Sequence, residues 1–377
     1  MTGKTLQAYL FRVITTDEPG LINFLVRLIL NLLEFIYLLL LKLTFRFTRR
    51  NKLPVPVISV GNITAGGTGK TPTVIWLVEM IQQKGFTPAI LTRGYGGNLQ
   101  DVGVCFKSSI QKGLSPIDIG DEPFLLSKLL PETPIVVGRE RYRNGLKALH
   151  VFPEIDLFIL DDGFQHWNLF RELDIVMLDA TKPFSNRHLL PRGFLREPLS
   201  SLKRAEIILL TRAKKIADNV LSDLKSDIIK VNPQVLVDVV EEKTSYLIPL
   251  GSDLKGQMLA AAEFLAGRKV AAITAIGNPR QFLGSLEQMG AEVGYFKAYK
   301  DHYRWEKEEI IELSKVLAEN GFSELIITAK DGVKLEPYID YFRKNALDCY
   351  VLSLDYQVGD PAIIQKITDI AKKRNKK

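Results

Sequence analysis

The first fifty residues contain a long apolar stretch that runs from Leu21 to Phe47. Its longest charge-free run, Phe35–Leu41, is much shorter than the roughly 20 residues that a bilayer-spanning helix needs. With a turn of about 100° per residue, the residues that interrupt the stretch share one sector of a helical wheel. They are Asn23, Arg27, Asn31, Glu34, Lys42 and Arg46. The pattern predicts an amphipathic helix with a broad apolar face and a narrow polar one.

Three placements of this helix are open from the sequence. We favour insertion of the apolar face into a membrane interface, where the basic residues Arg46, Arg49, Arg50 and Lys52 would meet anionic head groups. The alternatives are a helix that buries this face on the protein's own core and a helix that spans the bilayer. A cleaved signal peptide fits poorly, because the apolar segment is too long and no small-residue cleavage site follows it.

After Pro54 the pattern alternates between short apolar runs and helical stretches. The runs predicted as strands are Val55–Val60, Ala89–Thr92, Ile135–Val137, Ile155–Leu160, Ile175–Leu178 and Ile207–Leu210, and Thr73–Lys84 is predicted as a helix. Strands that are apolar on both faces are typical of a parallel sheet covered by helices on both sides. The expected fold class is therefore α/β, with a doubly wound parallel sheet. The segment Asn98–Ser115 has no clear period and is interpreted as an excursion from the sheet.

The same pattern restarts near Leu247–Gly267 and predicts a second, smaller α/β domain. Its expected strands are Lys269–Ile276, Glu324–Thr328 and Tyr350–Leu354, with helices from Arg280 and over Glu306–Glu319. The predicted organisation is an N-terminal membrane-associating helix (1–50), a main domain (51–246), a linker (247–267) and a C-terminal domain (268–377).

Composition narrows the class of protein only slightly. The chain is 46% hydrophobic and 25% charged, as folded proteins are, and its net charge of +7 favours anionic partners such as acidic lipid, nucleic acid or a phosphorylated substrate. No basic–aromatic motif or zinc spacing indicates nucleic-acid binding, and no motif indicates a protein partner. The two cysteines, Cys105 and Cys349, exclude a disulfide framework and suit a reducing, cytosol-facing location.

A glycine-rich loop lies between the first predicted strand and the first predicted helix of the main domain. It reads Thr64-Ala65-Gly66-Gly67-Thr68-Gly69-Lys70-Thr71 and matches the phosphate-binding P-loop everywhere except its first position, where threonine replaces glycine. Glycines allow successive backbone N–H groups to turn toward phosphate oxygens, and the following helix N-terminus adds partial positive charge. Lys70 would neutralise the β- and γ-phosphates of ATP, and Thr71 would offer its hydroxyl to Mg²⁺.

The strand predicted at Ile155–Leu160 is followed by two acids, Asp161 and Asp162. A P-loop enzyme needs a carboxylate at the end of a neighbouring apolar strand to hold the metal ion. Adjacent carboxylates at such a place are costly to bury without a counter-ion. We therefore expect Asp161 and Asp162 to bind Mg²⁺ together with Thr71; a solvated strand end is the alternative.

Six segments, taken in order, make the chain similar to the tetraacyldisaccharide 4′-kinases of lipid A biosynthesis. They are Gly61–Pro72, Arg93–Gly96, Gly120–Pro123, Asp161–His166, Pro191–Pro198 and Asp301–Tyr303. The resemblance covers roughly Leu53 to Leu335, and the apolar N-terminal helix agrees with it. It implies transfer of the γ-phosphate of ATP to the 4′-hydroxyl of a tetraacylated glucosamine disaccharide 1-phosphate. It also implies Mg²⁺ as cofactor and a peripheral or monotopic location on the cytoplasmic face of the inner membrane.

The resemblance further implies roles for individual residues. Asp121 matches the family's proposed general base and His302 its partner, while Lys70 and Arg196 would stabilise the transferring phosphate. From the residues alone, Asp121 could instead cap a helix, and His302 could be a structural or surface histidine.

Four further residues are expected to contact the substrate or to support the site: Gln165, His166, Arg192 and Glu197. Gln165 and His166 follow the two acids closely enough to help to place Mg²⁺ or water, although His166 could be purely structural. Arg192, Arg196 and Glu197 could contact the reacting phosphate or the substrate's own phosphate, or could pair with one another. The segment that begins at Thr328 departs from the family's pattern, with Ala329 in place of an acid.

Two other P-loop proteins are rival interpretations. A membrane-associated partitioning ATPase would carry a lysine at the second position of the loop, where this chain has Ala65. A GTPase would carry the guanine-specific Asn/Thr-Lys-x-Asp, and here the only similar segment has Lys330 one place late. The residues therefore favour a kinase over both.

Overall fold

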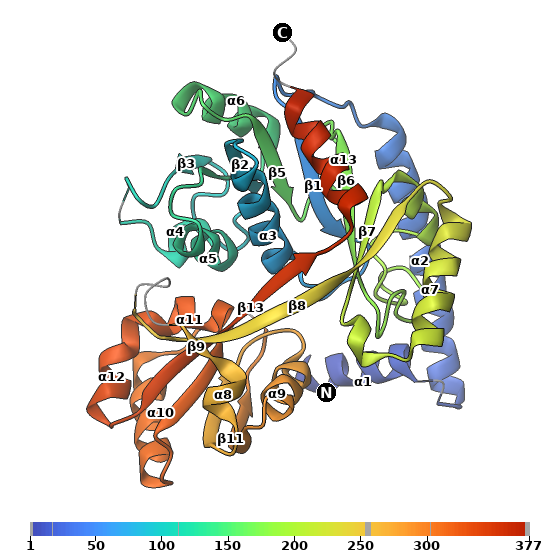
Figure 1. Ribbon diagram of the computed structural model, residues 1–377. Helices are drawn as coiled ribbons and strands as arrows, with labels where there is room; N and C mark the ends of the chain where they lie inside the picture. Colours follow the sequence, from blue (N-terminus) through green and yellow to red (C-terminus); the bar gives the residue numbers. More distant parts are fainter. Residues whose placement is uncertain (1–2, 17, 112, 253–257, 302, 374–377) are drawn as a thin grey trace. The chain divides into compact units, whose positions relative to one another are not determined.

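The computed structural model describes residues 3–16, 18–111, 113–252, 258–301 and 303–373 (Figure 1). The chain forms two compact units. Unit 1 comprises Met1–Lys70, Leu160–Val240 and Val358–Lys377, and unit 2 comprises Thr71–Ile159 and Glu241–Gln357. The chain thus passes from unit 1 into unit 2 within the glycine-rich loop. The domain boundaries expected from the sequence remain a prediction.

Unit 1 contains a parallel sheet. Strand β1 (Val57–Asn62) pairs with β6 (Leu173–Asp179), β6 with β7 (Ile207–Thr211), and β7 with the beginning of β8 (Leu236–Pro249). All residues of β1 and β7 are buried, because helices and loops cover both faces of these strands. The side chains on one face of β6 and β7 form a core with Leu224 and Ile228 of α7 (Asp218–Val231). Helix α13 (Pro361–Ala371) also belongs to this unit.

The N-terminal segment of unit 1 is a helical hairpin of α1 (Gly3–Thr15) and α2 (Leu21–Phe47). Helix α2 is long and apolar enough to cross a membrane by length and composition, yet only 6% of its most apolar stretch is buried. Leu30 is its one buried residue among those that the structure describes, and most residues of the broad apolar face are exposed. The alternative in which this face packs on the protein's own core is therefore wrong for the described structure.

Unit 2 begins with α3 (Lys70–Gln83), which follows the glycine-rich loop, and includes a small mixed sheet. Strand β2 (Pro88–Thr92) pairs in parallel with β4 (Ile135–Val137), and the short β3 (Val104–Phe106) pairs antiparallel with β4. Between β3 and β4 lie α4 (Pro116–Ile119) and α5 (Asp121–Leu129). Helix α6 (Arg141–Val151) then leads to β5 (Leu157–Asp161), whose last two residues belong to unit 1.

A second parallel sheet in unit 2 has the strand order β11–β10–β12–β13. Its members are β10 (Lys269–Thr274), β11 (Glu292–Ala298), β12 (Glu324–Thr328) and β13 (Asp348–Val358). The short β9 (Leu259–Ala260) pairs antiparallel with the end of β8. The remaining helices are α8 (Ala261–Leu265), α9 (Pro279–Gln288), α10 (Lys307–Glu319), α11 (Ala329–Leu335) and α12 (Ile339–Lys344).

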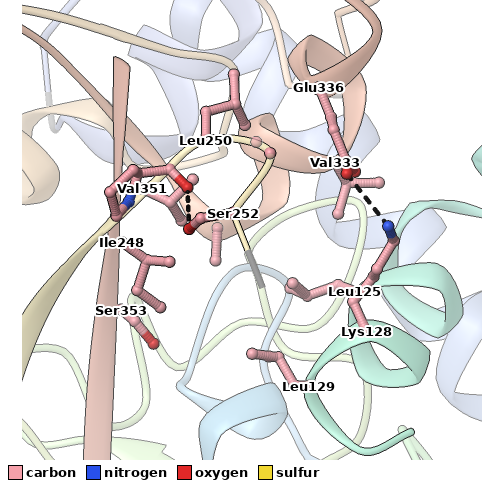
Figure 2. Close-up of a pocket in the computed structure, with 14 residues that line it drawn as sticks. Leu125, Lys128, Leu129, Ile248, Leu250, Ser252, Val333, Glu336, Val351 and Ser353 are labelled. Carbon is pink, nitrogen blue, oxygen red and sulfur yellow. Dashed lines mark hydrogen bonds and ion pairs between the residues drawn. The ribbon is translucent and has the colours of Figure 1, made fainter. Parts of the chain in front are cut away.

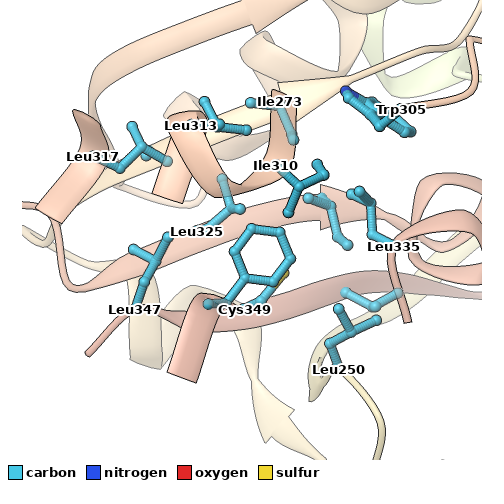
Figure 3. Close-up of a cluster of buried hydrophobic side chains, with 14 of the residues drawn as sticks. Leu250, Ile273, Trp305, Ile310, Leu313, Leu317, Leu325, Leu335, Leu347 and Cys349 are labelled. Carbon is cyan, nitrogen blue, oxygen red and sulfur yellow. The ribbon is translucent and has the colours of Figure 1, made fainter. Parts of the chain in front are cut away.

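One face of this second sheet is buried under α10, α11 and α12. Ile273 and Leu325 of the sheet pack against Ile310, Leu313 and Leu317 of α10, and Trp305 closes one end of the cluster (Figure 3). Apolar residues of α11, such as Leu335, pack into this core. Because protein cores are close-packed, this packing also fixes the positions of the polar residues of α11. The expected α/β class, with predominantly parallel strands, is confirmed.

Candidate active site

The glycine-rich loop leaves β1 and leads into the N-terminus of α3, as a P-loop does. Gly66 and Gly69 have φ angles of 119° and 84°, a backbone conformation that side chains disfavour. A Cβ atom placed on Gly66 or Gly67 would meet no atom of the described structure within 4 Å, so the loop is open on this side. The loop therefore has both the conformation and the free space that a phosphate group requires.

Neighbouring elements of unit 1 hold the loop from three directions. The Asn62 side chain donates to Thr68 Oγ1 at 3.1 Å, and the Thr211 hydroxyl donates to the Thr68 carbonyl at 3.3 Å. Arg212, which follows β7, donates to the Gly67 carbonyl at 2.9 Å and forms an ion pair with Asp179. These bonds hold the Gly67 and Thr68 carbonyl groups and the Thr68 side chain, so this part of the loop has a fixed conformation.

Lys70 and Arg196 share one carboxylate, Asp162. The Lys70 Nζ atom lies 3.3 Å from Asp162 Oδ1, and Arg196 Nη1 lies 3.0 Å from Oδ2. Burial acts to raise the pKa of Asp162, but the charges of Lys70 and Arg196 outweigh it and lower the pKa below the usual value. Three residues from separate parts of the sequence, all of them candidates from sequence, thus meet in one ionised cluster.

The segment that carries Arg196 is bonded directly to the glycine-rich loop. The Arg196 N–H donates to the Ile63 carbonyl and the Ala65 N–H donates to the Phe194 carbonyl, both at 2.7 Å. Thr64 and Leu195 consequently form an isolated antiparallel bridge. The bonds to the glycine-rich loop therefore fix the backbone position of Arg196.

Glu197 is buried and paired within the protein. Its carboxylate accepts two bonds from Arg204, at 2.8 and 3.1 Å, and one from Gln165 Nε2 at 3.0 Å. The same Gln165 nitrogen donates to the Asn62 carbonyl at 3.0 Å. Glu197 thus pairs within the protein, which is one of the roles left open from the sequence. Gln165 bonds both to Glu197 and to the last residue of β1.

The remaining two supporting candidates lie at the edges of this cluster. The His166 carbonyl accepts a bond of 2.7 Å from Arg171, and the Arg192 carbonyl accepts one of 3.3 Å from Asn186. Both of these bonds involve the backbone. A role of either side chain toward Mg²⁺ or substrate remains a prediction.

Asp121 lies in unit 2, at the first position of α5, and pairs with Lys334 of α11. The Lys334 Nζ atom lies 3.6 Å from Asp121 Oδ2, and the two side chains are only 6% and 10% exposed. Gly120 is the residue that caps α5, so Asp121 is not its N-cap. The ammonium group beside it holds the Asp121 carboxylate in place, and a general base must be positioned in this way.

Lys334 is in turn positioned by Asp331, one turn earlier in α11, at 3.8 Å. Asp331 is fully buried and accepts bonds from the Thr274 and Thr328 hydroxyls and from the Ala275 N–H. Burial raises the pKa of Asp331, and these hydrogen bonds and Lys334 offset part of that rise. The Trp305 ring lies 5.7 Å from Lys334 Nζ on its other side. Lys334 therefore has one fixed place, between two carboxylates and an aromatic face.

Two further ion pairs join α5 to α11 and to the residue that follows it. Glu122 pairs with Lys330 at 3.4 Å, and Lys128 pairs with Glu336 at 3.2 Å. The second of these pairs lines a pocket that contains none of the candidate site residues (Figure 2). His302, the expected partner of Asp121, lies outside the described residues. Its neighbour Asp301 is exposed.

Comparison with known proteins agrees with the presence of a glycine-rich phosphate-binding loop and of the charged residues beside it. The family model described as tetraacyldisaccharide-1-P 4′-kinase matches residues 26–372. The chain belongs to the tetraacyldisaccharide-1-phosphate 4′-kinase family. Among its relatives is the tetraacyldisaccharide 4′-kinase of Halothermothrix orenii, which is 34% identical over 93% of this chain and 94% of the relative. That of Syntrophus aciditrophicus is 35% identical over 82% of each chain.

A solved structure of the same family also matches this kinase. It is the crystal structure of LpxK from Aquifex aeolicus in complex with ATP, with a TM-score of 0.67 and 28% sequence identity. The match covers 92% of this chain and 99% of that chain. It supports the α/β fold, and ATP as the nucleotide bound by members of the family.

The donor atoms near the glycine-rich loop of the kinase suit Mg²⁺. In the described part of the chain, no three His, Cys, Asp or Glu side chains converge on one point, as they would in a metal cage made by the protein alone. Mg²⁺ in nucleotide sites instead takes one or two carboxylates together with waters and phosphate oxygens. The Thr71 hydroxyl and the carboxylates of Asp161 and Asp162 are donors of this kind, and Asp161 is buried at the end of β5.

Sequence reasoning missed several residues that the kinase places in or beside these clusters. Lys334 lies in no recognised motif, and Asp331 belongs to the segment in which Ala329 breaks the family's pattern. Arg212 lies after an apolar strand and carries no motif, and only its φ angle of 60° marks it as unusual. Glu34, an acid within an apolar helix, was interpreted only as part of the polar strip of that helix.

Proposed function

We propose that this protein transfers the γ-phosphate of ATP to the 4′-hydroxyl of a tetraacylated glucosamine disaccharide 1-phosphate at a membrane surface. The single observation that carries the proposal is the ionised cluster of Lys70, Asp162 and Arg196 beside an open glycine-rich loop. Membership of the kinase family supports the lipid acceptor. The fold and the loop alone would suit many P-loop enzymes.

Lys70 and Arg196 supply positive charge where phosphoryl transfer builds up negative charge. Phosphoryl transfer depends mainly on positioning and on electrostatic stabilisation of the phosphate oxygens. In the described structure both cations are paired with Asp162, and we infer that they turn to phosphate oxygens when nucleotide binds. Mg²⁺ held by Thr71, Asp161 and Asp162 would neutralise charge on the β- and γ-phosphates.

Asp121 acts as the general base in this proposal. A sugar hydroxyl is a weak nucleophile, so it needs a positioned acceptor for its proton as the phosphoryl group transfers. Lys334 holds Asp121 in its orientation before the reaction. His302 would assist Asp121, as the family resemblance implies.

The exposed face of α2 is the part of the protein that we assign to the membrane. Its side chains include Leu32, Phe35 and Leu39, which are 60%, 57% and 44% exposed. Each such side chain gains about 1.5–3 kcal/mol when it is fully removed from water. A peripheral or monotopic placement on the cytoplasmic face of the inner membrane would bring the enzyme to a substrate whose acyl chains stay in the bilayer.

The Lys70→Ala variant tests the site. With γ-labelled Mg-ATP and the acylated disaccharide 1-phosphate in detergent, we expect the label to enter the lipid with the wild-type protein. The variant should lose at least about 100-fold in rate, because it lacks the cation at the β- and γ-phosphates. Circular dichroism checks that the variant is folded. A folded variant with near-normal transfer would show that the glycine-rich loop is not the nucleotide site.

A further inference from the structure

Two partly buried side chains of α2, Tyr37 and Glu34, bond to the segment that carries Arg196. The Tyr37 hydroxyl donates to the Arg196 carbonyl at 2.9 Å. One turn earlier, Glu34 accepts a bond of 2.7 Å from the Leu189 N–H and contacts His188 Nδ1 at 2.9 Å. Helix α2 thus bonds to the protein through one side, while most residues of its apolar face are exposed.

Arg196 connects these bonds to the candidate active site. The backbone of Arg196 is held on both sides, by its N–H to Ile63 before the glycine-rich loop and by its carbonyl to Tyr37 of α2. Its side chain contacts Asp162, which is also the partner of Lys70. A displacement of Tyr37 would therefore move the backbone from which the Arg196 guanidinium is directed.

We propose that Tyr37 and Glu34 of α2 are positioning residues for phosphoryl transfer. Their bonds fix the position of the Leu189–Arg196 segment and therefore that of the Arg196 side chain. The proposal rests on the proposed function of Arg196. It makes α2 a structural part of the active site in addition to its membrane role. The bond from Tyr37 is available at all physiological pH values, because burial, together with the charge of Glu197, raises the pKa of its hydroxyl.

The hairpin provides a matched control. The Tyr9 hydroxyl donates to Asn23 Oδ1 at 2.7 Å, so this bond joins α1 to α2 and does not involve the Arg196 segment. Tyr37→Phe and Tyr9→Phe each remove one hydroxyl group and one hydrogen bond. A difference between the two variants therefore reports on the connection to Arg196 and not on the stability of the hairpin.

Kinetics form the first arm of the experiment, with the full-length protein and detergent-dispersed lipid. For Tyr37→Phe we expect kcat to fall about two- to tenfold, the effect of one lost hydrogen bond, with the KM values for ATP and lipid little changed. Tyr9→Phe should keep the wild-type kcat. Glu34→Ala should lower kcat more than Glu34→Gln, because glutamine retains an acceptor oxygen for the Leu189 N–H.

Hydrogen–deuterium exchange of the peptide that covers residues 188–198 forms the second arm and needs no substrate. We expect faster exchange in Tyr37→Phe and Glu34→Ala than in the wild type and in Tyr9→Phe. Unchanged exchange, or equal loss of kcat in the two tyrosine variants, would overturn the proposal. Faster exchange in a protein whose wild type transfers no phosphate to lipid would leave the positioning intact and would overturn the proposed function instead.

Discussion

Asp121 and Lys334 form a buried ion pair that joins α5 to α11 within unit 2. Their carboxylate and ammonium groups are 3.6 Å apart, and Asp331 shares the same ammonium group. Burying such charges is tolerated only while each has its partner, so removal of one partner is more damaging than removal of both. The pair thus has a structural role and, in our proposal, a catalytic one.

The two roles can be separated by variants of both residues. We expect Asp121→Asn to lower kcat by about 10²–10⁴-fold with little change in ATP affinity, because asparagine cannot accept the proton. Lys334→Met should lower kcat and should also lower the free energy of unfolding by about 3–5 kcal/mol, since it leaves two buried carboxylates without a counter-ion. Adding Lys334→Met to Asp121→Asn should cost little further kcat, because Lys334 acts through Asp121.

Lys128→Met is the matched control for this series. It removes the same charge from the seam between α5 and α11, but its pair with Glu336 is considerably exposed and contributes at most about 1 kcal/mol. Steady-state kinetics and urea unfolding measure both effects. Independent, additive losses of kcat in the double variant would contradict the assignment of Lys334 to Asp121.

Individual residues differ in how far the sequence reveals them. Lys70, Asp162 and Arg196 lie in recognisable motifs, and the structure brings these three together. Lys334 is more than two hundred residues from Asp121, and no local pattern marks a pairing over such a distance. Helical periodicity placed Glu34 on the polar strip of the predicted helix, but it did not indicate that Glu34 contacts the protein, and it did not single out Tyr37.

At the scale of elements, buried strands were the most predictable part of the fold. Strands β4 and β12 have the expected bounds, because short runs of apolar residues covered on both faces leave little choice. The strands β3, β8 and β11 were missed. Strand β3 has three residues, β8 carries the charged run Glu241-Glu242-Lys243, and β11 is partly exposed and contains Gly294. None of these patterns differs locally from that of a loop.

Helix α2 has a testable division between its two faces. We expect Leu32→Ser/Phe35→Ser/Leu39→Ser to lower partitioning onto anionic vesicles at least about 100-fold, because each side chain loses about 1–2 kcal/mol of apolar transfer. Turnover of detergent-dispersed lipid should stay within about twofold of the wild-type value, because these side chains point away from the protein. Deletion of the hairpin should reduce both quantities, since it also removes Tyr37 and Glu34.

Vesicle flotation and detergent kinetics measure these effects. Val220→Ser/Ile229→Ser serves as the control, because these side chains of α7 are each 47% exposed but lie outside the hairpin. Equal flotation of the triple variant and the wild type would show that membrane contact comes from another part of the protein.

At the scale of the whole molecule, the candidate residues are divided between the two compact units. Lys70, Asp162, Arg196 and α2 belong to unit 1, and Thr71, Asp121 and Lys334 belong to unit 2. The division falls within the glycine-rich loop itself. The sequence predicted the α/β class. The contact between α5 and α11 within unit 2 was not predicted, because it depends on side-chain contacts that the hydrophobic pattern of the sequence does not reveal.

The central claim is that the γ-phosphate goes to one hydroxyl of a lipid. The most direct measurement is the structure of the product that the wild-type protein forms from Mg-ATP and the acylated disaccharide 1-phosphate, by mass spectrometry and phosphorus NMR. We predict one added phosphate per disaccharide, at the 4′ position, in equal amount to the ATP consumed. Release of the phosphate to water without a lipid product, or its attachment at another position, would contradict the account.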